Sequence, residues 1–201
     1  MNTMDAVTGC DLIPPPDLPP AEGNGTTIVT EEQVPTSAEE IMLLTTVEAL
    51  AKQPASPDGE IGQRELALAE ALARYAHYGQ VDQAGVDYIE HPLAVAAQLD
   101  DPMAKVVALL HDVLEDSMIT ADQLRTLFGD AIADSVKAMT RQEGEDYNDY
   151  LRRLAMDPLA TQVKLADLHH NMDLSRLASV TEKDRKRLGK YKEAETYLRG
   201  L

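Results

Sequence analysis

Residues 109–117 read LLHDVLEDS, so that two leucines precede four polar residues within six positions: His111, Asp112, Glu115 and Asp116. Positions four apart share one face of an α-helix, which stacks His111 on Glu115 and Asp112 on Asp116. The remaining face is apolar, with Val106, Leu109, Leu110, Val113 and Leu114. The stretch therefore predicts a helix over 103–116 with one chemical face and one core face. A solvated polar helix end is the alternative.

Helical spacing of apolar residues continues through most of the chain, and no sustained alternating pattern or internal repeat interrupts it. Thr120 is placed as an N-cap and Gly129 as the helix stop after it. The sequence predicts an all-α fold. The expected helices cover 66–76, 92–99, 103–116, 120–129, 130–140, 146–156, 158–173 and 181–199.

The N-terminal third differs in composition from the rest. Residues 1–36 contain PPPDLPP, GNG and VPTS, which is too polar and Pro-rich to bury a core, so we expect a disordered acidic arm. Within 37–53, Ser37 and Glu40 match a capping box ahead of an apolar stripe at Ile41, Leu44 and Val47. This helix either packs on the main domain or binds a partner.

Three segments follow from this reading: an arm over 1–36, a short helix and linker over 37–60, and one compact domain over 61–201. The arm is a candidate protein-contact segment. The single Cys10 excludes an intrachain disulfide and a cysteine zinc site. Neither a run of about 18 apolar residues nor a secretory signal is present, so we expect no membrane contact and a cytoplasmic protein.

The formal net charge is −17 over 201 residues. An acidic surface repels phosphate backbones, which disfavours general nucleic-acid binding. A small polyanionic substrate stays compatible with this charge if bases or a metal line a local pocket.

Two further motifs accompany the opening stretch. In YIEHPLAV, Pro92 suits a first helical turn and places His91 at the helix entrance; a surface or capping histidine is the alternative. In VKLADLHHNM, Lys164, Asp167 and His170 or Asn171 share a face. Two histidines and two aspartates on three helices offer nitrogen and oxygen ligands that suit manganese, iron, cobalt or zinc.

The ordered set AHYGQ, YIEHPLAV, LLHDVLEDS and VKLADLHHNMDLSRL resembles the HD-domain metal-dependent phosphohydrolases, in the branch of RelA/SpoT-type alarmone hydrolases and small alarmone hydrolases. The resemblance covers about 62–199. It implies an HD-domain helical bundle, with His91, His111, Asp112 and Asp167 as metal ligands, Glu115 and Asp116 as the acidic pair beside the attacking water, and Asn171 as a substrate contact.

The activity implied by the resemblance is removal of the 3′-pyrophosphate of ppGpp or pppGpp, so that the substrate is a small phosphorylated nucleotide. The implied cofactor is a divalent transition metal, and manganese is the first candidate. Lys164 and Arg176 are further candidate phosphate contacts, with solvated surface bases as the alternative. Arg187 or Lys190 is another candidate contact to the substrate's phosphates, with an amphipathic packing helix as the alternative. Tyr147 and Tyr150 are candidates for the pocket wall, with core packing as the alternative.

The chain departs from the family pattern near the substrate. Asp82 and Gln83 stand where the alarmone enzymes carry a basic pair against guanine, and Leu168 and Asp173 replace arginines. These changes leave the metal and water residues in place and put guanine recognition in question. Two alternatives therefore remain: an HD phosphohydrolase acting on another nucleotide or phosphate ester, and a non-catalytic nucleotide- or partner-binding HD module.

Overall fold

The fold is all-α, as the sequence predicts. The computed structural model describes residues 35, 37–54, 61–82, 84–176 and 180–200. Within these residues no strand forms, and an isolated bridge joins Val81 to Asp87. The helices are α1 (Ala38–Ala51), α2 (Gln63–Ala76), α3 (Glu90–Ala96), α4 (Pro102–Leu110), α5 (Val113–Asp116), α6 (Ala121–Phe128), α7 (Asp130–Met139), α8 (Tyr147–Leu154), α9 (Pro158–Met172), η1 (Leu174–Arg176) and α10 (Glu182–Arg199).

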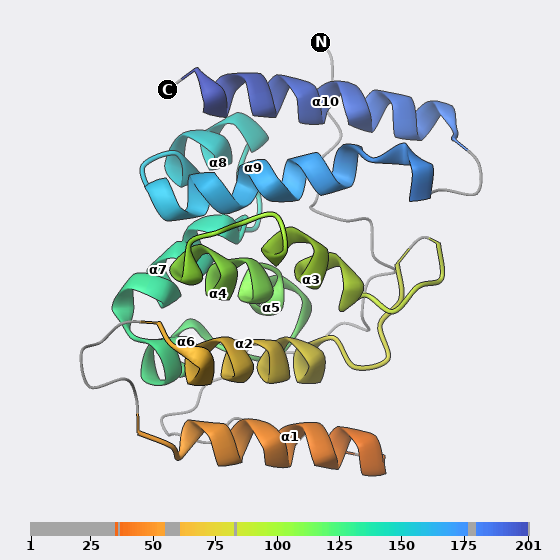
Figure 1. The fold of residues 1–201 in the computed structure, drawn as a ribbon. Coiled ribbons are helices and arrows are strands. Elements are labelled where there is room, and N and C mark those ends of the chain that lie inside the picture. The colour runs from red at the N-terminus through yellow and green to blue at the C-terminus, as the bar shows by residue number, and fades with distance from the viewer. Residues whose placement is uncertain (1–34, 36, 55–60, 83, 177–179, 201) are drawn as a thin grey trace.

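The helices form a stack in which α1 packs on α2, α2 on α4, α4 on α9 and α9 on α10 (Figure 1). Helix α4 lies at the centre because its sequence is apolar on nearly every side, and six of its nine residues are buried. Helix α9 contacts α3, α4, α7 and α10. Chemistry carried by α3, α4 and α9 is therefore brought to one place.

Local sequence signals explain most helix ends. Thr120 accepts a hydrogen bond from Gln123 N in a full capping box, and Gly129 ends α6 at φ 83°, where a side chain would be strained. Asp146 and Asp157 cap α8 and α9. Helix α3 starts two residues before the predicted start, with Pro92 as its third residue. Proline is tolerated there because the N–H groups of a first turn have no intrahelical partner.

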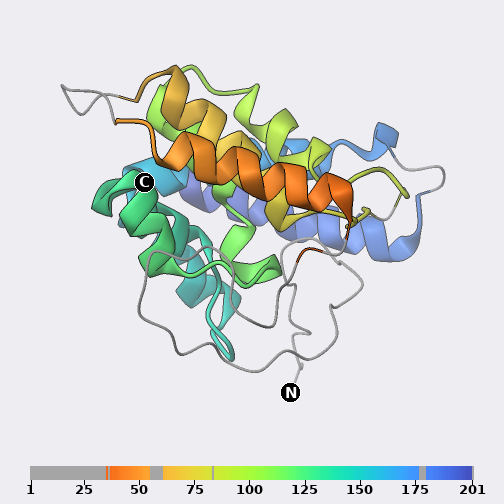
Figure 2. The same ribbon diagram turned by 90° about the horizontal axis from the view of Figure 1, so that it is seen from below.

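Helix α1 packs lengthwise on α2, as the view from below shows (Figure 2). Ser37 caps it by accepting from Glu40 N at 3.0 Å. Of the predicted stripe, Val47 is fully buried, whereas Ile41 is 52% exposed. The helix thus contributes to the core through its centre.

Apart from Pro35, the predicted arm over 1–36 lies outside the residues that the structure describes. Its disorder, its role as a protein-contact segment and the three segment boundaries stay predictions. No described helix combines the length and apolar content needed to span a bilayer. The cytoplasmic location also stays a prediction.

Candidate metal centre and active site

Four predicted metal ligands meet at the junction of α3, α4 and α9. His91 is the second residue of α3, His111 and Asp112 lie between α4 and α5, and Asp167 is the tenth of the 15 residues of α9. Both histidines and Asp167 are at most 5% exposed. The alternatives of a surface His91 and a solvated polar end at His111 are therefore wrong.

The ligand atoms converge closely. His111 Nε2 lies 3.0 Å from Asp112 Oδ2 and 3.8 Å from Asp167 Oδ1. His91 Nε2 lies 3.2 Å from Asp167 Oδ1 and 3.7 Å from Asp112 Oδ2. The two histidine Nε2 atoms are 3.2 Å apart. Each of the two histidines therefore lies within 3.8 Å of a carboxylate oxygen of both aspartates.

The predicted continuous helix over 103–116 is wrong at its centre. Helix α4 ends at Leu110, and α5 begins at Val113. The ring of His111 turns back so that Nδ1 contacts the Ala108 carbonyl at 2.7 Å, an oxygen that an unbroken helix would use for the Asp112 N–H. Neighbouring residues of a regular helix point about 100° apart. The interruption brings both side chains to the same point.

This arrangement fits a divalent ion. Ligand atoms that each lie about 2.0–2.2 Å from one ion are separated by roughly 3.0–3.8 Å at ordinary bond angles, and the observed contacts fall in that range. Two imidazoles with two carboxylates are the donor set of borderline divalent metals. His91, His111 and Asp112 also form a compact group with ligand atoms within 4.8 Å of one another.

Opposite charges within the cluster attract one another. Burial disfavours charge on His111, but the carboxylates of Asp112 and Asp167 outweigh it and raise the pKa of His111 to about 9. Burial acts to raise the pKa of Asp167, yet Lys164 and the two histidines hold that pKa well below its usual range. The carboxylates of Asp112 and Asp167 thus stay ionised beside the histidines, and this negative charge favours binding of a cation.

Neighbouring groups orient the ligands. The Tyr88 hydroxyl donates to Asp112 Oδ2 at 2.5 Å, and Tyr88 is 1% exposed. The Nδ1 atoms of His91 and His170 lie 2.8 Å apart. Tyr88 was missed by sequence reasoning, although its position three residues before His91 places it one turn away. Contacts of this kind fix ring orientation and tautomer in metal sites.

Lys164 and Asn171 both contact Asp167. Lys164 Nζ donates to Oδ2 at 2.9 Å, and Asn171 Nδ2 donates to Oδ1 at 2.5 Å. Lys164 is 8% exposed, so the alternative of a solvated surface base is wrong for it. Arg176 ends η1, and its side chain lies outside the described part of the chain. The roles of all three in substrate binding stay predictions.

Glu115 and Asp116 follow the ligands on α5. Glu115 Oε1 accepts a hydrogen bond from Arg141 N at 2.6 Å, and the residue lines the cavity next to the ligand cluster. Loss of hydration, the charge of Asp112 and that of Glu115 raise the pKa of Asp116 to about 8. Loss of hydration also raises the pKa of Glu115. Both carboxyl groups therefore hold a proton more tightly than a free carboxyl group does.

A cavity of about 500 Å³, including its open mouth, lies over the cluster. Sequence reasoning named Tyr147 and Tyr150 as candidates for its wall and missed Met139, Arg141 and Tyr191. The wall is formed by His91, His111, Asp112, Glu115, Met139, Arg141, Tyr147, Tyr150, Lys164, Asp167, Asn171 and Tyr191.

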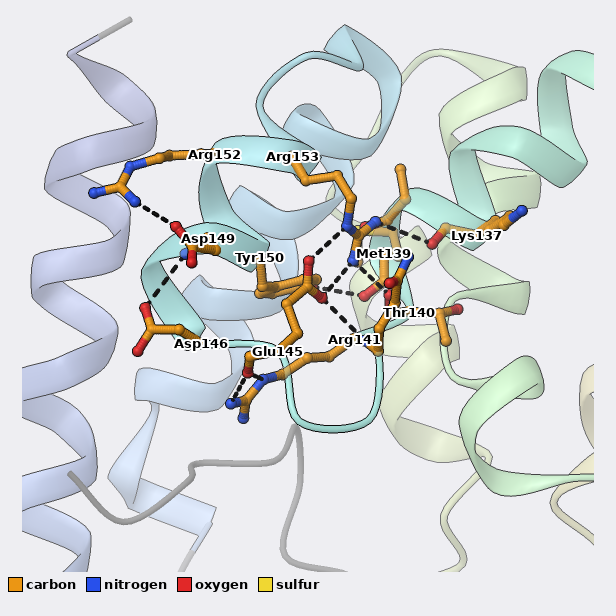
Figure 3. A network of polar contacts seen from close by, with 12 residues as sticks. Lys137, Met139, Thr140, Arg141, Glu145, Asp146, Asp149, Tyr150, Arg152 and Arg153 are labelled. Atoms are coloured by element: carbon orange, nitrogen blue, oxygen red, sulfur yellow. Dashed lines mark hydrogen bonds and ion pairs between the residues drawn. The ribbon is translucent and has the colours of Figure 1, made fainter. Parts of the chain in front are cut away.

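The loop between α7 and α8 brings Arg141 to this cavity, and a dense network holds the loop (Figure 3). Arg153 binds both carboxylate oxygens of Glu145 at 2.8 Å and the Thr140 carbonyl at 2.9 Å. The Arg141 guanidinium donates to the Glu145 carbonyl at 2.9 Å. Because Arg141 N holds Glu115, the network links the loop to the acidic pair.

The AHYGQ motif supports α5 from the other side. Gln80 Nε2 donates to the Asp116 carbonyl at 3.0 Å, and Gln80 Oε1 lies 2.9 Å from His77 Nδ1. The His77 ring packs at 4.8 Å from that of Tyr88, the residue that binds Asp112. The motif therefore contacts both α5, which carries Glu115 and Asp116, and the tyrosine that binds Asp112.

Asp82 has a local partner in the loop that precedes α3. Its Oδ1 accepts from Ala84 N at 2.8 Å and Val86 N at 3.0 Å. Gln83 lies outside the described residues. The aspartate thus stabilises its own turn, at a position where the alarmone enzymes place a base.

Known proteins are similar to this chain in sequence and in fold. The family model described as HD domain matches residues 69–193. A guanosine-3′,5′-bis(diphosphate) 3′-pyrophosphohydrolase of Haemophilus influenzae is 40% identical over 134 residues, which is 59% of this chain and 20% of the relative. The bifunctional (p)ppGpp synthase/hydrolase SpoT of Escherichia coli is 33% identical over 131 residues, 58% of this chain and 18% of the relative.

Other relatives carry the name of the opposite activity. A probable GTP pyrophosphokinase of Mycobacterium leprae is 35% identical over 128 residues, 57% of this chain and 16% of the relative. The chain spans about a fifth or less of the length of these curated relatives. The solved structure of a metazoan ortholog of SpoT that hydrolyzes ppGpp superimposes with a TM-score of 0.57 and 21% identity, over 73% of this chain and 87% of that chain. It shows the same fold.

Proposed function

This chain belongs to the HD-domain family, and on that premise we propose that it is a metal-dependent phosphohydrolase that removes the 3′-pyrophosphate of ppGpp or pppGpp to give GDP or GTP. The observation that carries the proposal is the convergence of His91, His111, Asp112 and Asp167 on one point, with an acidic pair beside them. The names of the relatives supply the substrate.

His91, His111, Asp112 and Asp167 would hold the ion. Manganese is our first candidate because imidazole and carboxylate ligands together suit it. When bound, a divalent ion lowers the pKa of a water molecule and polarises a phosphoryl oxygen. The protein itself supplies the four donors and the groups that orient them, namely Tyr88 and the Ala108 carbonyl.

The acidic pair is proposed to handle protons. Arg141 N occupies Oε1 of Glu115, which leaves the other oxygen to orient and deprotonate a water molecule. The raised pKa of Asp116, about 8, keeps a carboxylic acid available near neutral pH. A carboxylate base and a nearby acid are the two groups that hydrolysis of a phosphate ester uses.

Cations in the cavity wall are proposed to bind the phosphate groups. Arg141 and Lys164 line the cavity together with Asn171. Lys164 and Asn171 contact Asp167, so their first role is to orient that ligand, and a substrate phosphate would share them. Arg176, on the segment after α9, remains a proposed phosphate contact.

Selection of the base is where this chain is proposed to differ. Asp82 offers a carboxylate in place of a cation that would stack on guanine, and it uses that carboxylate to hold its own turn. The loss of a cation–π contact costs roughly 0.5–2 kcal/mol. We therefore expect weak ppGpp affinity or loose selection among purines, and a phosphohydrolase for another nucleotide is the second candidate.

A substrate panel tests the proposal. The purified protein with manganese would be given ppGpp, its adenine counterpart and simple 3′-phosphorylated nucleotides, and products would be separated by chromatography. We expect GDP and pyrophosphate from ppGpp, and a loss of rate on the order of 10² or more in Glu115→Ala or Asp116→Ala with metal binding kept.

His111→Ala and Asp112→Ala serve as the matched variants, because each removes a ligand and should abolish metal occupancy and turnover together. Hydrolysis of another ester with none of ppGpp would select the second candidate. Inactivity on the whole panel with metal bound would favour a non-catalytic binding module.

A further inference from the structure

His170 makes a close contact with a metal ligand. Its Nδ1 lies 2.8 Å from Nδ1 of His91, and the ring centroids are 4.9 Å apart. His91 is 5% exposed. Two imidazole nitrogens at this distance share one proton, so one ring donates and the other accepts.

The direction of this hydrogen bond decides whether His91 can bind a metal. A metal ligand needs a lone pair on Nε2, which requires the His91 proton on Nδ1, pointing at His170. The carboxylates around Nε2 favour the opposite tautomer, because Asp167 Oδ1 at 3.2 Å and Asp112 Oδ2 at 3.7 Å would each accept a proton from Nε2. A strong acceptor at Nδ1 is needed to offset them.

We infer that His170 is a positioning residue that accepts the Nδ1–H of His91 and so holds His91 in the tautomer that binds metal. The inference rests on the metal centre of the proposed function. The second histidine ligand has an equivalent partner, since His111 Nδ1 contacts the Ala108 carbonyl at 2.7 Å. One ligand is thus oriented by the backbone and the other by a side chain.

The position of His170 on α9 explains how it reaches both groups. Asp167 and His170 are three residues apart and therefore share a helix face. One turn of α9 delivers a metal ligand and the acceptor that orients another ligand. The adjacent His169 points elsewhere, is exposed, and has its Nδ1 2.9 Å from Oε1 of Gln98.

The test measures Mn²⁺ affinity of the full chain by isothermal titration after chelation. His170→Ala and His170→Phe remove the acceptor, and we expect Mn²⁺ to bind 10- to 100-fold more weakly. His170→Asn places an amide oxygen near the position of Nδ1, and we expect an affinity within about threefold of the wild type. His169→Ala is the matched control and should bind as the wild type does.

A second measurement covers the case in which a variant folds poorly. Long-range ¹H–¹⁵N spectra of the imidazole nitrogens should show His91 of the wild type protonated at Nδ1 and of His170→Phe shifted towards Nε2 protonation. Wild-type affinity in His170→Ala, or a wild-type His91 protonated at Nε2, would overturn the inference and leave the metal centre intact. A wild type that binds no divalent ion would overturn both.

Discussion

Replacing Arg153 by Met should loosen the loop that carries Arg141. Arg153 projects from α8 and contacts both oxygens of Glu145 and three carbonyls at the end of α7, those of Lys137, Ala138 and Thr140 (Figure 3). Methionine keeps the length and apolar stem of the side chain and removes all of these donors. The perturbation therefore tests the polar network with little change in packing.

The expected loss of stability is about 2–3 kcal/mol. Arg153 is the largest of the causes that hold the pKa of Glu145 at about 2, against an ordinary value of 4.5, and the Gln142 N–H and Arg141 add to it. The whole difference corresponds to about 3 kcal/mol, which is an upper bound for Arg153. The two side chains are 31% and 13% exposed, so solvent screening reduces this to roughly half. The lost carbonyl contacts add about 1 kcal/mol, because water replaces them.

The pH dependence follows from the same pair. A carboxyl group whose folded pKa is depressed stabilises the protein above its unfolded pKa, and that stability is lost as the pH falls through the folded pKa. The effect of Arg153→Met should therefore be full at pH 7 and should shrink as the pH falls from 4.5 towards 2.

Urea unfolding at pH 7 and pH 3.5 measures both effects, and ppGpp turnover measures the functional one. We expect kcat to fall about tenfold, because Arg141 N no longer holds Glu115 firmly, while Mn²⁺ affinity stays unchanged. Arg152→Met is the matched control: its ion pair with Asp149 is about two-thirds exposed on both sides and should contribute under 1 kcal/mol.

If Arg153→Met lost less than about 0.5 kcal/mol of stability at pH 7, or only as much as Arg152→Met, the network would not be what stabilises the loop between α7 and α8. A full loss of stability with unchanged kcat would refute its link to Glu115.

Two more changes have outcomes that the structure determines. Tyr147→Phe removes a buried hydroxyl that has no hydrogen-bond partner in the described part of the chain, so it should raise the free energy of unfolding by about 1 kcal/mol. The Tyr150 hydroxyl donates to Met139 O at 2.6 Å, so Tyr150→Phe should lower the free energy of unfolding by a similar amount. The opposite order of stabilities in urea titrations would contradict this. Asp116→Asn in metal-free protein should raise the melting temperature more at pH 8 than at pH 5. The reason is that a carboxyl group whose pKa is raised in the folded state destabilises the protein increasingly as the pH rises towards 8. An equal gain at both pH values would show that Asp116 ionises normally.

Some of the site could be predicted from sequence because it depends on short-range spacing. The motif order placed His91, His111, Asp112 and Asp167 on three helices, and the structure brings all four together. The cap at Thr120 was visible for the same reason, since capping is a local property.

The break at His111 could not be predicted, because the apolar spacing of α4 runs on into α5 without a Gly or Pro. At the break the His111 ring contacts the Ala108 carbonyl, a side-chain contact that apolar spacing does not reveal. The fold class is confirmed, and the solved SpoT ortholog shows the same fold.

The supporting residues depend on contacts between distant segments. Tyr88 binds Asp112 across 24 residues, Arg141 binds Glu115 across 26, and His170 meets His91 across 79. Helical periodicity describes one element at a time and carries no information on such pairs. Lys164 shows the same limit, since its burial against Asp167 follows from the packing of α9 on its neighbours.

The most direct test of the account is a titration of Mn²⁺ into chelated, metal-free protein while ppGpp breakdown is followed. If the four-residue cluster holds the ion that hydrolysis requires, the rate should rise from zero and saturate near one Mn²⁺ per chain, with GDP and pyrophosphate formed in equal amounts. A full rate in the presence of chelator, or no breakdown of ppGpp once one Mn²⁺ per chain is bound, would contradict it.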